Sequence, residues 1–316
     1  MDMNPVYLVL EMGVVAFFIG AAWLALRRGR FPFLELVSAA SFGILLEEGD
    51  QLIFETYHYA SDWVLVIDRA PVVIGLSWAL IIAGAMRITD ALGVRRRYAP
   101  FVDSVLAISL DLAFDAIAIR MGLWTWRDIG LSDGWFGVPA GNFYAWLFVT
   151  LGFTFLARWL REASRSRPAL EWWQLAVPVP AFVLLLLGLV PFSALQPVVD
   201  PAPGGGLGLF AMTLAAFCAV AAYGIWGPDR LPGNGEGAAM IDLHAAFGTR
   251  VAIHLVFLGA LFWLGLATSE PVLLLASLIM LALEWPLSRL ALARSGGGRQ
   301  RTVGVGRGVQ HHPMEE

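Results

Sequence analysis

Apolar residues in this chain are gathered into long runs that short polar segments separate. Several runs reach about 20 residues, the length that an α-helix needs to cross a hydrocarbon core of about 30 Å at 1.5 Å per residue. The pattern therefore predicts an all-α polytopic membrane bundle of about nine transmembrane helices. The predicted spans are 5–26, 33–55, 71–89, 100–121, 138–160, 172–192, 207–226, 245–267 and 271–292.

Arginine residues are distributed between the loops in the way that sets membrane orientation. They follow every odd-numbered span, whereas the alternate loops hold only Arg69 and Arg127. Because basic loops stay on the cytoplasmic side, we expect the N-terminus outside and the C-terminus cytoplasmic, in a multi-pass protein of the cell (plasma) membrane. The arginines that carry this prediction are Arg27, Arg28, Arg30, Arg95, Arg96, Arg97, Arg158, Arg161, Arg165, Arg167, Arg230, Arg289, Arg294, Arg299 and Arg301.

Composition agrees with a membrane protein and excludes several other classes. Hydrophobic residues make up 58% of the 316 residues and charged residues 15%, against roughly 45–50% and 25% in soluble domains. A net charge of -4 gives no reason to expect a nucleic-acid partner. The single cysteine, Cys218, cannot form an intramolecular disulfide. The expected surroundings are therefore the lipid bilayer.

Two changes in composition divide the chain. A polar segment with one proline follows the fifth span at 161–171, and a Pro/Gly-rich turn lies at 196–208. We expect a five-helix membrane core with an acidic pocket at 1–168, a four-helix membrane extension at 169–293, and a disordered cytoplasmic tail at 294–316.

Acidic side chains at membrane depth mark the candidate site. An ionisable group there costs about 2.5–3.5 kcal/mol and usually faces a partner or a cavity. The fourth span carries Asp111 and Asp115, an i, i+4 pair on one face. On the second span, four side chains are predicted to share an arc of about 100°: Glu47, Glu48, Gln51 and Glu55.

The helical rise places polar groups from four spans at one level. Glu48 and Asp115 are about 8–10 Å below the outer ends of their spans, Glu11 about 9 Å and Asn142 about 6 Å. We infer a polar pocket in the outer half of the bilayer, open toward the external face. Burial favours the protonated form of a carboxyl, which suits a general acid and equally suits a proton relay.

Other charged residues have simpler interpretations. Glu35, Glu55 and Asp103 lie near helix ends and are expected to reach the lipid headgroups. Arg250 on the eighth span and Glu284 on the ninth lie at similar depth, which favours an internal ion pair over a second site. The sequence has no haem, phosphate-loop or zinc-protease spacing, so no metal or organic cofactor is expected.

Four segments carry a pattern that is typical of one family. They are LEEGDQLIFETYHY from residue 46, APVVIGLSW from residue 70, DLAFDAIAIRMGLWTW from residue 111 and WFGVPAGNFYAW from residue 135. Over about residues 40–160 the chain resembles the membrane carotenoid-biosynthesis proteins that include the carotenoid hydratases. It departs from the family pattern at Ala116, where proline is usual, and at Ala145, where glycine is usual. The resemblance is not expected to extend to the last four spans.

The resemblance implies a lipophilic polyene or isoprenoid substrate and acid-catalysed addition of water to an acyclic carotenoid end. Protonating the alkene gives a tertiary carbocation that water captures, so the site needs an acid, a held water and a surface that tolerates positive charge. The implied catalytic residues are Asp111 or Asp115 as the acid and Glu48 at the water. The implied substrate-binding residues are Glu47, Glu11, Trp124, Trp126, Asn142, Trp146 and Tyr59, with the indoles facing the cation.

Two other classes of function stay open at this point. The carboxyls also suit a proton-coupled transporter, although the inverted repeat that many transporters have is missing from the sequence. The chain also suits a non-catalytic subunit of a pigment-synthesis complex that docks on carotenoid-pathway enzymes. A pocket joined laterally to lipid favours the enzyme, whereas a water path to both faces favours transport.

Overall fold

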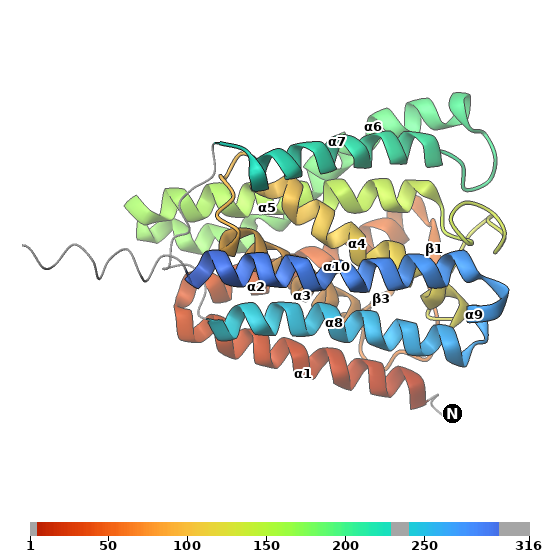
Figure 1. Ribbon diagram of the computed structural model, residues 1–316, viewed down its shortest axis with the longest axis horizontal. Helices are drawn as coiled ribbons and strands as arrows, with labels where there is room; N and C mark the ends of the chain where they lie inside the picture. The colour runs from red at the N-terminus through yellow and green to blue at the C-terminus, as the bar shows by residue number, and fades with distance from the viewer. Residues whose placement is uncertain (1–4, 229–239, 297–316) are drawn as a thin grey trace, which may run out of the picture.

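Long helices lying side by side build the molecule, and short strands cluster at one end of the bundle (Figure 1). The computed structural model describes residues 5–228 and 240–296. The helices are α1 (Pro5–Arg28), α2 (Arg30–Gly49), η1 (Asp50–Phe54), α3 (Val72–Ala91), α4 (Ala99–Arg120), α5 (Ala140–Ser166), η2 (Pro168–Ala176), α6 (Pro178–Val199), α7 (Leu207–Trp226), α8 (Met240–Trp263), α9 (Leu266–Ser269) and α10 (Pro271–Gly296). The strands are β1 (Tyr57–Tyr59), β2 (Val66–Ile67), β3 (Ala70–Pro71) and β4 (Trp124–Trp126).

Nine of the described helices have 20 residues or more, and each overlaps one predicted span. Seven of them are long and apolar enough to cross a membrane by length and composition. The other two, α2 and α4, carry more acidic and basic side chains and bury many of them inside the bundle. The prediction of an all-α polytopic helical bundle is therefore confirmed.

Helix α4 lies at the centre of the packing. It contacts α3, α5, α7, α8 and α10 and buries most of its side chains. The helices of the predicted extension therefore pack directly on the predicted core. The division at residue 168 stays a prediction.

The predicted tail begins inside a helix. Helix α10 continues to Gly296, and the Arg294 guanidinium donates hydrogen bonds to the Leu92 and Ile225 carbonyls at 3.0 and 3.1 Å. The tail prediction is therefore wrong for its first three residues, because these contacts extend the helix. The rest of the tail, like Arg230, lies outside the described residues.

The second predicted span changes helix type near its end, and the helical path continues to Phe54. Helix α2 stops at Gly49, and η1 is a single π-helical turn before Glu55 takes a left-handed φ of 50°. Thr56 Oγ1 donates to the Asp50 carboxylate at 2.8 Å and holds the turn. A π-turn contains more residues than an α-turn, so the 100° spacing fails after Gly49. The prediction of one shared face through Glu55 is wrong for this reason.

The two ends of the bundle differ in chemistry. At the strand end, β1 pairs antiparallel with β4, and β2 pairs with β3. At the opposite end, which we call the Arg-rich end, α1, α3 and α5 finish in or beside arginines. Figure 1 shows β1 and α9 at the strand end, on the same side as the start of α1.

Carboxylates near the Arg-rich end are buried in ion pairs. Arg158 pairs with Asp103 at 3.0 Å and also with Asp90, while Arg161 pairs with Asp90 and Glu35 at 2.7 Å each. Asp103 is 0% exposed and Glu35 4%. The expectation that these two reach the headgroups is therefore wrong, because arginines from α5 hold them inside the bundle.

The internal ion pair predicted between the eighth and ninth spans is present. Arg250 Nη2 lies 2.6 Å from Glu284 Oε1, and both side chains are buried. Arg250 also donates to the Leu106 carbonyl at 2.8 Å and to Ser109 Oγ at 2.9 Å. These contacts attach α8 and α10 to α4.

Candidate functional site

Two aspartates and one asparagine meet inside the bundle, toward the strand end. Asp111 and Asp115 stand one turn apart on α4 and are 1% and 2% exposed. Asn142, in the first turn of α5, donates from Nδ2 to Asp111 Oδ2 at 3.1 Å and to Asp115 Oδ2 at 2.6 Å. We call these three residues the aspartate–asparagine cluster. The depth calculation places Asp115 and Asn142 at one level, and the structure brings them into contact.

The two aspartates differ in their remaining contacts. Trp124 Nε1, on β4, donates to Asp115 Oδ1 at 2.9 Å, so both oxygens of Asp115 accept hydrogen bonds. Asp111 Oδ1 is buried and accepts no hydrogen bond from the described residues. The cluster therefore has one carboxylate oxygen with capacity for a proton or a further donor.

Glu47 is a third buried carboxyl near the cluster. Its Oε1 accepts a hydrogen bond from Trp78 Nε1 at 2.7 Å, and its Oε2 accepts hydrogen bonds from the hydroxyls of Tyr57 and Tyr59. Glu47 also interacts electrostatically with the aspartate pair. Neutral donors therefore surround this carboxyl.

Close packing of α2 on α3 gives Glu47 its tryptophan partner. A Cβ built on Gly43 would lie 2.6 Å from Trp78 Cβ and 2.9 Å from the Gly75 Cα. A larger residue at either glycine would push the helices apart. The glycines thus bring the Trp78 indole within reach of Glu47.

Strand pairing connects the donors of Glu47 to the donor of Asp115. Tyr59 lies opposite Trp124 and Tyr57 opposite Trp126 in the β1–β4 ladder. The ring centroids of Tyr59 and Trp124 are 6.2 Å apart, and those of Tyr57 and Trp126 are 4.8 Å apart. The ladder therefore joins the two carboxyl sites into one aromatic and polar unit.

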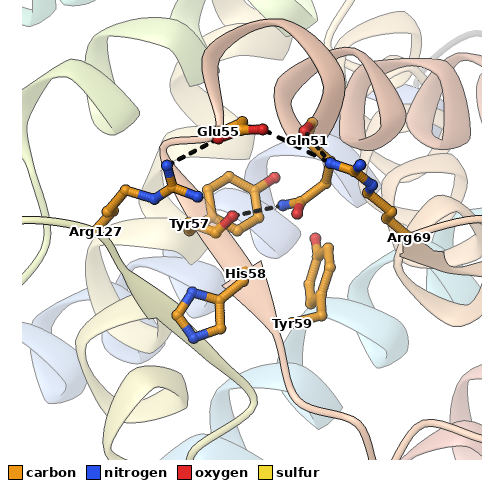
Figure 2. Close-up of a pocket in the computed structure, with 7 residues that line it drawn as sticks. All are labelled: Gln51, Glu55, Tyr57, His58, Tyr59, Arg69 and Arg127. Atoms are coloured by element: carbon orange, nitrogen blue, oxygen red, sulfur yellow. Dashed lines mark hydrogen bonds and ion pairs between the residues drawn. The ribbon is translucent and has the colours of Figure 1, made fainter.

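A polar cavity of about 300 Å³ adjoins this unit, and we call it the outer cavity. Figure 2 shows Tyr57 and Tyr59 on one strand, with Arg69 and Arg127 on either side. Arg127 pairs with Glu55 at 2.9 Å. The lining residues are Gln51, Glu55, Tyr57, His58, Tyr59, Arg69 and Arg127. Polar walls of this kind suit water.

Tyr57 and Tyr59 stay protonated over a wide pH range. Burial, followed by the neighbouring Glu47 carboxylate, raises the pKa of both phenols well above its usual value. Both hydroxyls therefore act as hydrogen-bond donors to Glu47 at neutral pH.

Two of the predicted site residues bind loop backbone instead of the cluster. Glu11 Oε1 accepts hydrogen bonds from the amides of Val64 and Leu65 at 2.9 and 3.3 Å. Glu48 Oε1 accepts from the amides of Arg69 and Ala70 at 3.0 and 2.7 Å. These carboxylates fix the loop between β1 and α3. Glu47, the neighbour of Glu48, takes the inward position.

The remaining predicted tryptophans form part of the aromatic surroundings. Trp146 packs on Trp78 with ring centroids 4.1 Å apart, and its ring is 5.9 Å from Phe114. Trp126 packs on Tyr57, and its buried Nε1 donates to none of the described residues.

Sequence reasoning missed Trp78 and Tyr57 as partners of Glu47. The alternation in Tyr57–His58–Tyr59 was a usable signal, because residues i and i+2 of an extended segment share a face. The Trp78 contact depends on how α2 and α3 cross, which no local pattern gives. Among the described residues, no group of three or more His, Cys, Asp or Glu is placed to hold a metal ion.

These features define a polytopic membrane protein with a carboxyl cluster buried among neutral donors. Residues 3–214, more than half of the chain, match the family described as carotenoid biosynthesis protein, and the chain belongs to this family. It has no significant match among curated proteins or solved structures. The match covers α6 and the start of α7, so the expectation that the resemblance stops before the last four spans is wrong.

Proposed function

We propose that this carotenoid-biosynthesis protein acts in the plasma membrane and adds water to an end double bond of an acyclic carotenoid. The observation that carries the proposal is the Asn142 amide bonded to both Asp111 and Asp115. Buried carboxyls that share one donor, in unequal environments, are a common arrangement for proton transfer.

The proposed acid is Asp111. Two ionised carboxylates on one amide would repel each other, so the pair favours holding one proton. Asp115 receives hydrogen bonds on both oxygens, which stabilises its ionised form. Asp111 Oδ1 has no hydrogen-bond donor among the described residues and is therefore the oxygen that we assign the proton.

The proposed reaction has two bond-forming steps. The alkene π electrons take the proton of Asp111, which leaves a tertiary carbocation and an Asp111 carboxylate. A water oxygen then bonds to the cationic carbon and returns one proton to that carboxylate. Alkene and water become a tertiary alcohol, and the aspartate pair is restored to its starting state.

Neighbouring groups support a transient cation. The ionised Asp115 supplies negative charge, and the ring faces of Trp124 and Trp146 attract positive charge. Trp146 lies one turn along α5 from Asn142, and Trp124 bonds directly to Asp115. These indoles are the proposed contacts of the reacting end group.

The outer cavity is the proposed source of water. Its wall contains Tyr57 and Tyr59, whose hydroxyls bond to Glu47, the carboxyl that interacts electrostatically with the aspartates. We assign Glu47 a role in orienting this polar path. Glu48, which holds the Arg69 and Ala70 amides, is left out of the proposed chemistry.

The substrate in this proposal is a lipophilic polyene that enters from the bilayer, and carotenoid-pathway enzymes are the proposed partners. Every residue of the proposed site lies within the predicted core at 1–168. We assign the extension at 169–293 a supporting role, since α7, α8 and α10 pack on α4.

The test compares pigments from cells that make an acyclic carotenoid. The native chain is expected to yield a product heavier by one water, and Asp111→Asn is expected to lower that yield by at least about 100-fold. Asp128→Asn is the matched control, because Asp128 is exposed and has a left-handed φ of 56° that asparagine tolerates. Its yield should equal that of the native chain.

Two results would contradict the proposal. One is full hydration by Asp111→Asn, which removes the assigned acid. The other is an unchanged pigment extract with the native protein present in the membrane. In that case, proton uptake by proteoliposomes without any carotenoid would favour the transporter interpretation.

A further inference from the structure

A second cavity opens between α1, α3 and α8, far from the proposed chemistry. It has a volume of about 520 Å³ and is lined on α1 from Ala16 to Arg28. At 1.5 Å per residue this wall is about 18 Å long, close to half of a hydrocarbon core of about 30 Å. The cavity, which we call the α1–α8 groove, therefore spans about one leaflet.

Small residues keep the groove open. A Cβ built on Gly20 of α1 or on Gly248 of α8 would meet nothing within 4 Å. Most other lining side chains are apolar, such as Phe17, Leu24 and Leu80. An apolar gap at membrane depth loses contact energy if it stays empty and excludes water. A hydrocarbon chain is the occupant that these walls fit.

The Arg-rich end of the groove has unused hydrogen-bond donors. Arg87 makes one ion pair, with Glu35 at 3.8 Å, and donates no hydrogen bond to the described residues. Glu35 already accepts a closer hydrogen bond, at 2.7 Å, from Arg161. Arg28 pairs with Asp242 at 3.2 Å, but its buried Nη1 has no partner among the described residues.

These guanidinium groups also repel one another. Arg28 and Arg161 both lie near enough to Arg87 to repel it, while Glu35 and Asp90 attract it. An anion between Arg87 and Arg28 would relieve this repulsion and accept their free N–H groups. Guanidinium matches phosphate oxygens in geometry as well as charge.

We propose that the α1–α8 groove binds one anionic phospholipid. Its phosphate lies between Arg87 and Arg28, and one of its hydrocarbon chains lies along α1 past Gly20. Basic pockets between transmembrane helices at the cytoplasmic side are the places where anionic headgroups bind. A zwitterionic lipid offers the same phosphate but brings its own cation, which the two arginines disfavour.

The test measures lipid retention by native mass spectrometry and the unfolding temperature of the full chain in detergent. The probes are phosphatidylglycerol, phosphatidylcholine and inorganic phosphate. Phosphatidylglycerol is expected to be retained and to raise the unfolding temperature, while inorganic phosphate has no effect. Arg87→Gln is expected to weaken phosphatidylglycerol binding by about tenfold, the size of a lost charge-assisted hydrogen bond.

A second variant fills the groove without touching its charges. Gly248→Leu adds a side chain in open space and should reduce retention by a similar factor. Gly259→Leu makes the same change on α8 outside the groove, where a Cβ also meets nothing within 4 Å. Arg96→Gln removes an exposed arginine at the same end of the bundle. Both controls should retain lipid like the native chain.

Three results would overturn the proposal. They are equal retention of the two lipids, unchanged binding by both Arg87→Gln and Gly248→Leu, and stabilisation by inorganic phosphate as large as that by phosphatidylglycerol. If Arg87→Gln fails to fold, Gly248→Leu still decides the question because it leaves the ion pairs intact. No readout uses catalysis, so this test is independent of the hydration proposal.

Discussion

Helix α4 buries aspartates in two regions that treat them differently. Near the Arg-rich end, Asp103 faces the Arg158 guanidinium at 3.0 Å. Two turns further along, Asp111 and Asp115 are held by the Asn142 amide and the Trp124 indole. Among the described residues, no arginine pairs with either of these two aspartates.

Under the proposed hydration, this difference separates a structural use of buried charge from a chemical one. An arginine partner fixes a carboxylate in its ionised form and attaches α4 to α5. Loss of that partner leaves a buried, uncompensated charge. Amide and indole donors carry no charge, so in the proposed reaction the aspartate pair can release a proton and take it back. The proposed chemistry therefore uses the carboxyls that no arginine compensates, toward the strand end.

Removing the buried Arg158 guanidinium should have the largest effect on stability. Arg158→Met leaves Asp103 and Asp90 without their main partner and should lower the free energy of unfolding by about 3–5 kcal/mol. Thermal unfolding in detergent measures this loss. Arg165→Met is the control, because Arg165 and its partner Glu162 are mostly exposed and such pairs contribute under about 1 kcal/mol. Equal losses in the two variants would contradict a structural role for the buried ion pairs of Arg158.

The same substitution at two positions of α4 sharpens the comparison. Asp103→Asn should cost about 3 kcal/mol because the buried Arg158 loses a bidentate partner. Asp111→Asn should cost under about 1 kcal/mol, because no cation is left unpaired. Unfolding temperatures of the two variants, measured side by side, check the order. A larger loss for Asp111→Asn would contradict it.

Removing the Asn142 amide, which bridges the two aspartates, should have an intermediate effect on stability. Asn142→Leu removes the donor that Asp111 and Asp115 share and should cost about 1–3 kcal/mol. The yield of hydrated pigment should fall with it. Tyr144→Phe, two residues along α5, is the control, since the Tyr144 hydroxyl donates no hydrogen bond to the cluster. Both variants lie on the same helix. Unchanged yield in Asn142→Leu would argue against a shared proton.

The smallest expected effect is a loss of stability at alkaline pH. The raised pKa values of Tyr57 and Tyr59 mean that their neutral forms stabilise the fold. This contribution is complete below the usual pKa of about 10 and is lost as the pH rises toward the folded-state values. The unfolding temperature should therefore hold up to about pH 10 and then fall. The fall should be shallower in the Tyr57→Phe, Tyr59→Phe double variant, and an identical fall would contradict this assignment.

Hydropathy was sufficient to predict the helices but not the change from α-helix to π-helix in the second span. The run through Gln51 and Phe54 reads as continuous α-helix, and only the backbone hydrogen bond from Glu55 N to Asp50 O, at 2.7 Å, reveals the π-turn. Periodicity alone also cannot separate Glu47 from Glu48 in the last turn of α2. That choice depends on Trp78 across the α2–α3 crossing.

Only those contacts of the site that follow from helical spacing were predictable from the sequence. The i, i+4 spacing pairs Asp111 with Asp115, and the helical rise gives the level of Asn142. The contact of Trp124 with Asp115 depends on a chain reversal after α4, and the Tyr59–Trp124 pairing joins distant segments. Such non-local contacts leave no periodic signal in the sequence.

The three aspartates of α4 also have a consequence for biogenesis. Inserting Asp103, Asp111 and Asp115 into lipid on a lone helix would cost roughly 8–10 kcal/mol at about 2.5–3.5 kcal/mol each. Two residues of α5 supply partners for all three aspartates: Arg158 pairs with Asp103, and Asn142 donates hydrogen bonds to Asp111 and Asp115. Helix α4 is therefore expected to leave the translocon only after α5 has been synthesised, and the two helices should enter the bilayer as a hairpin.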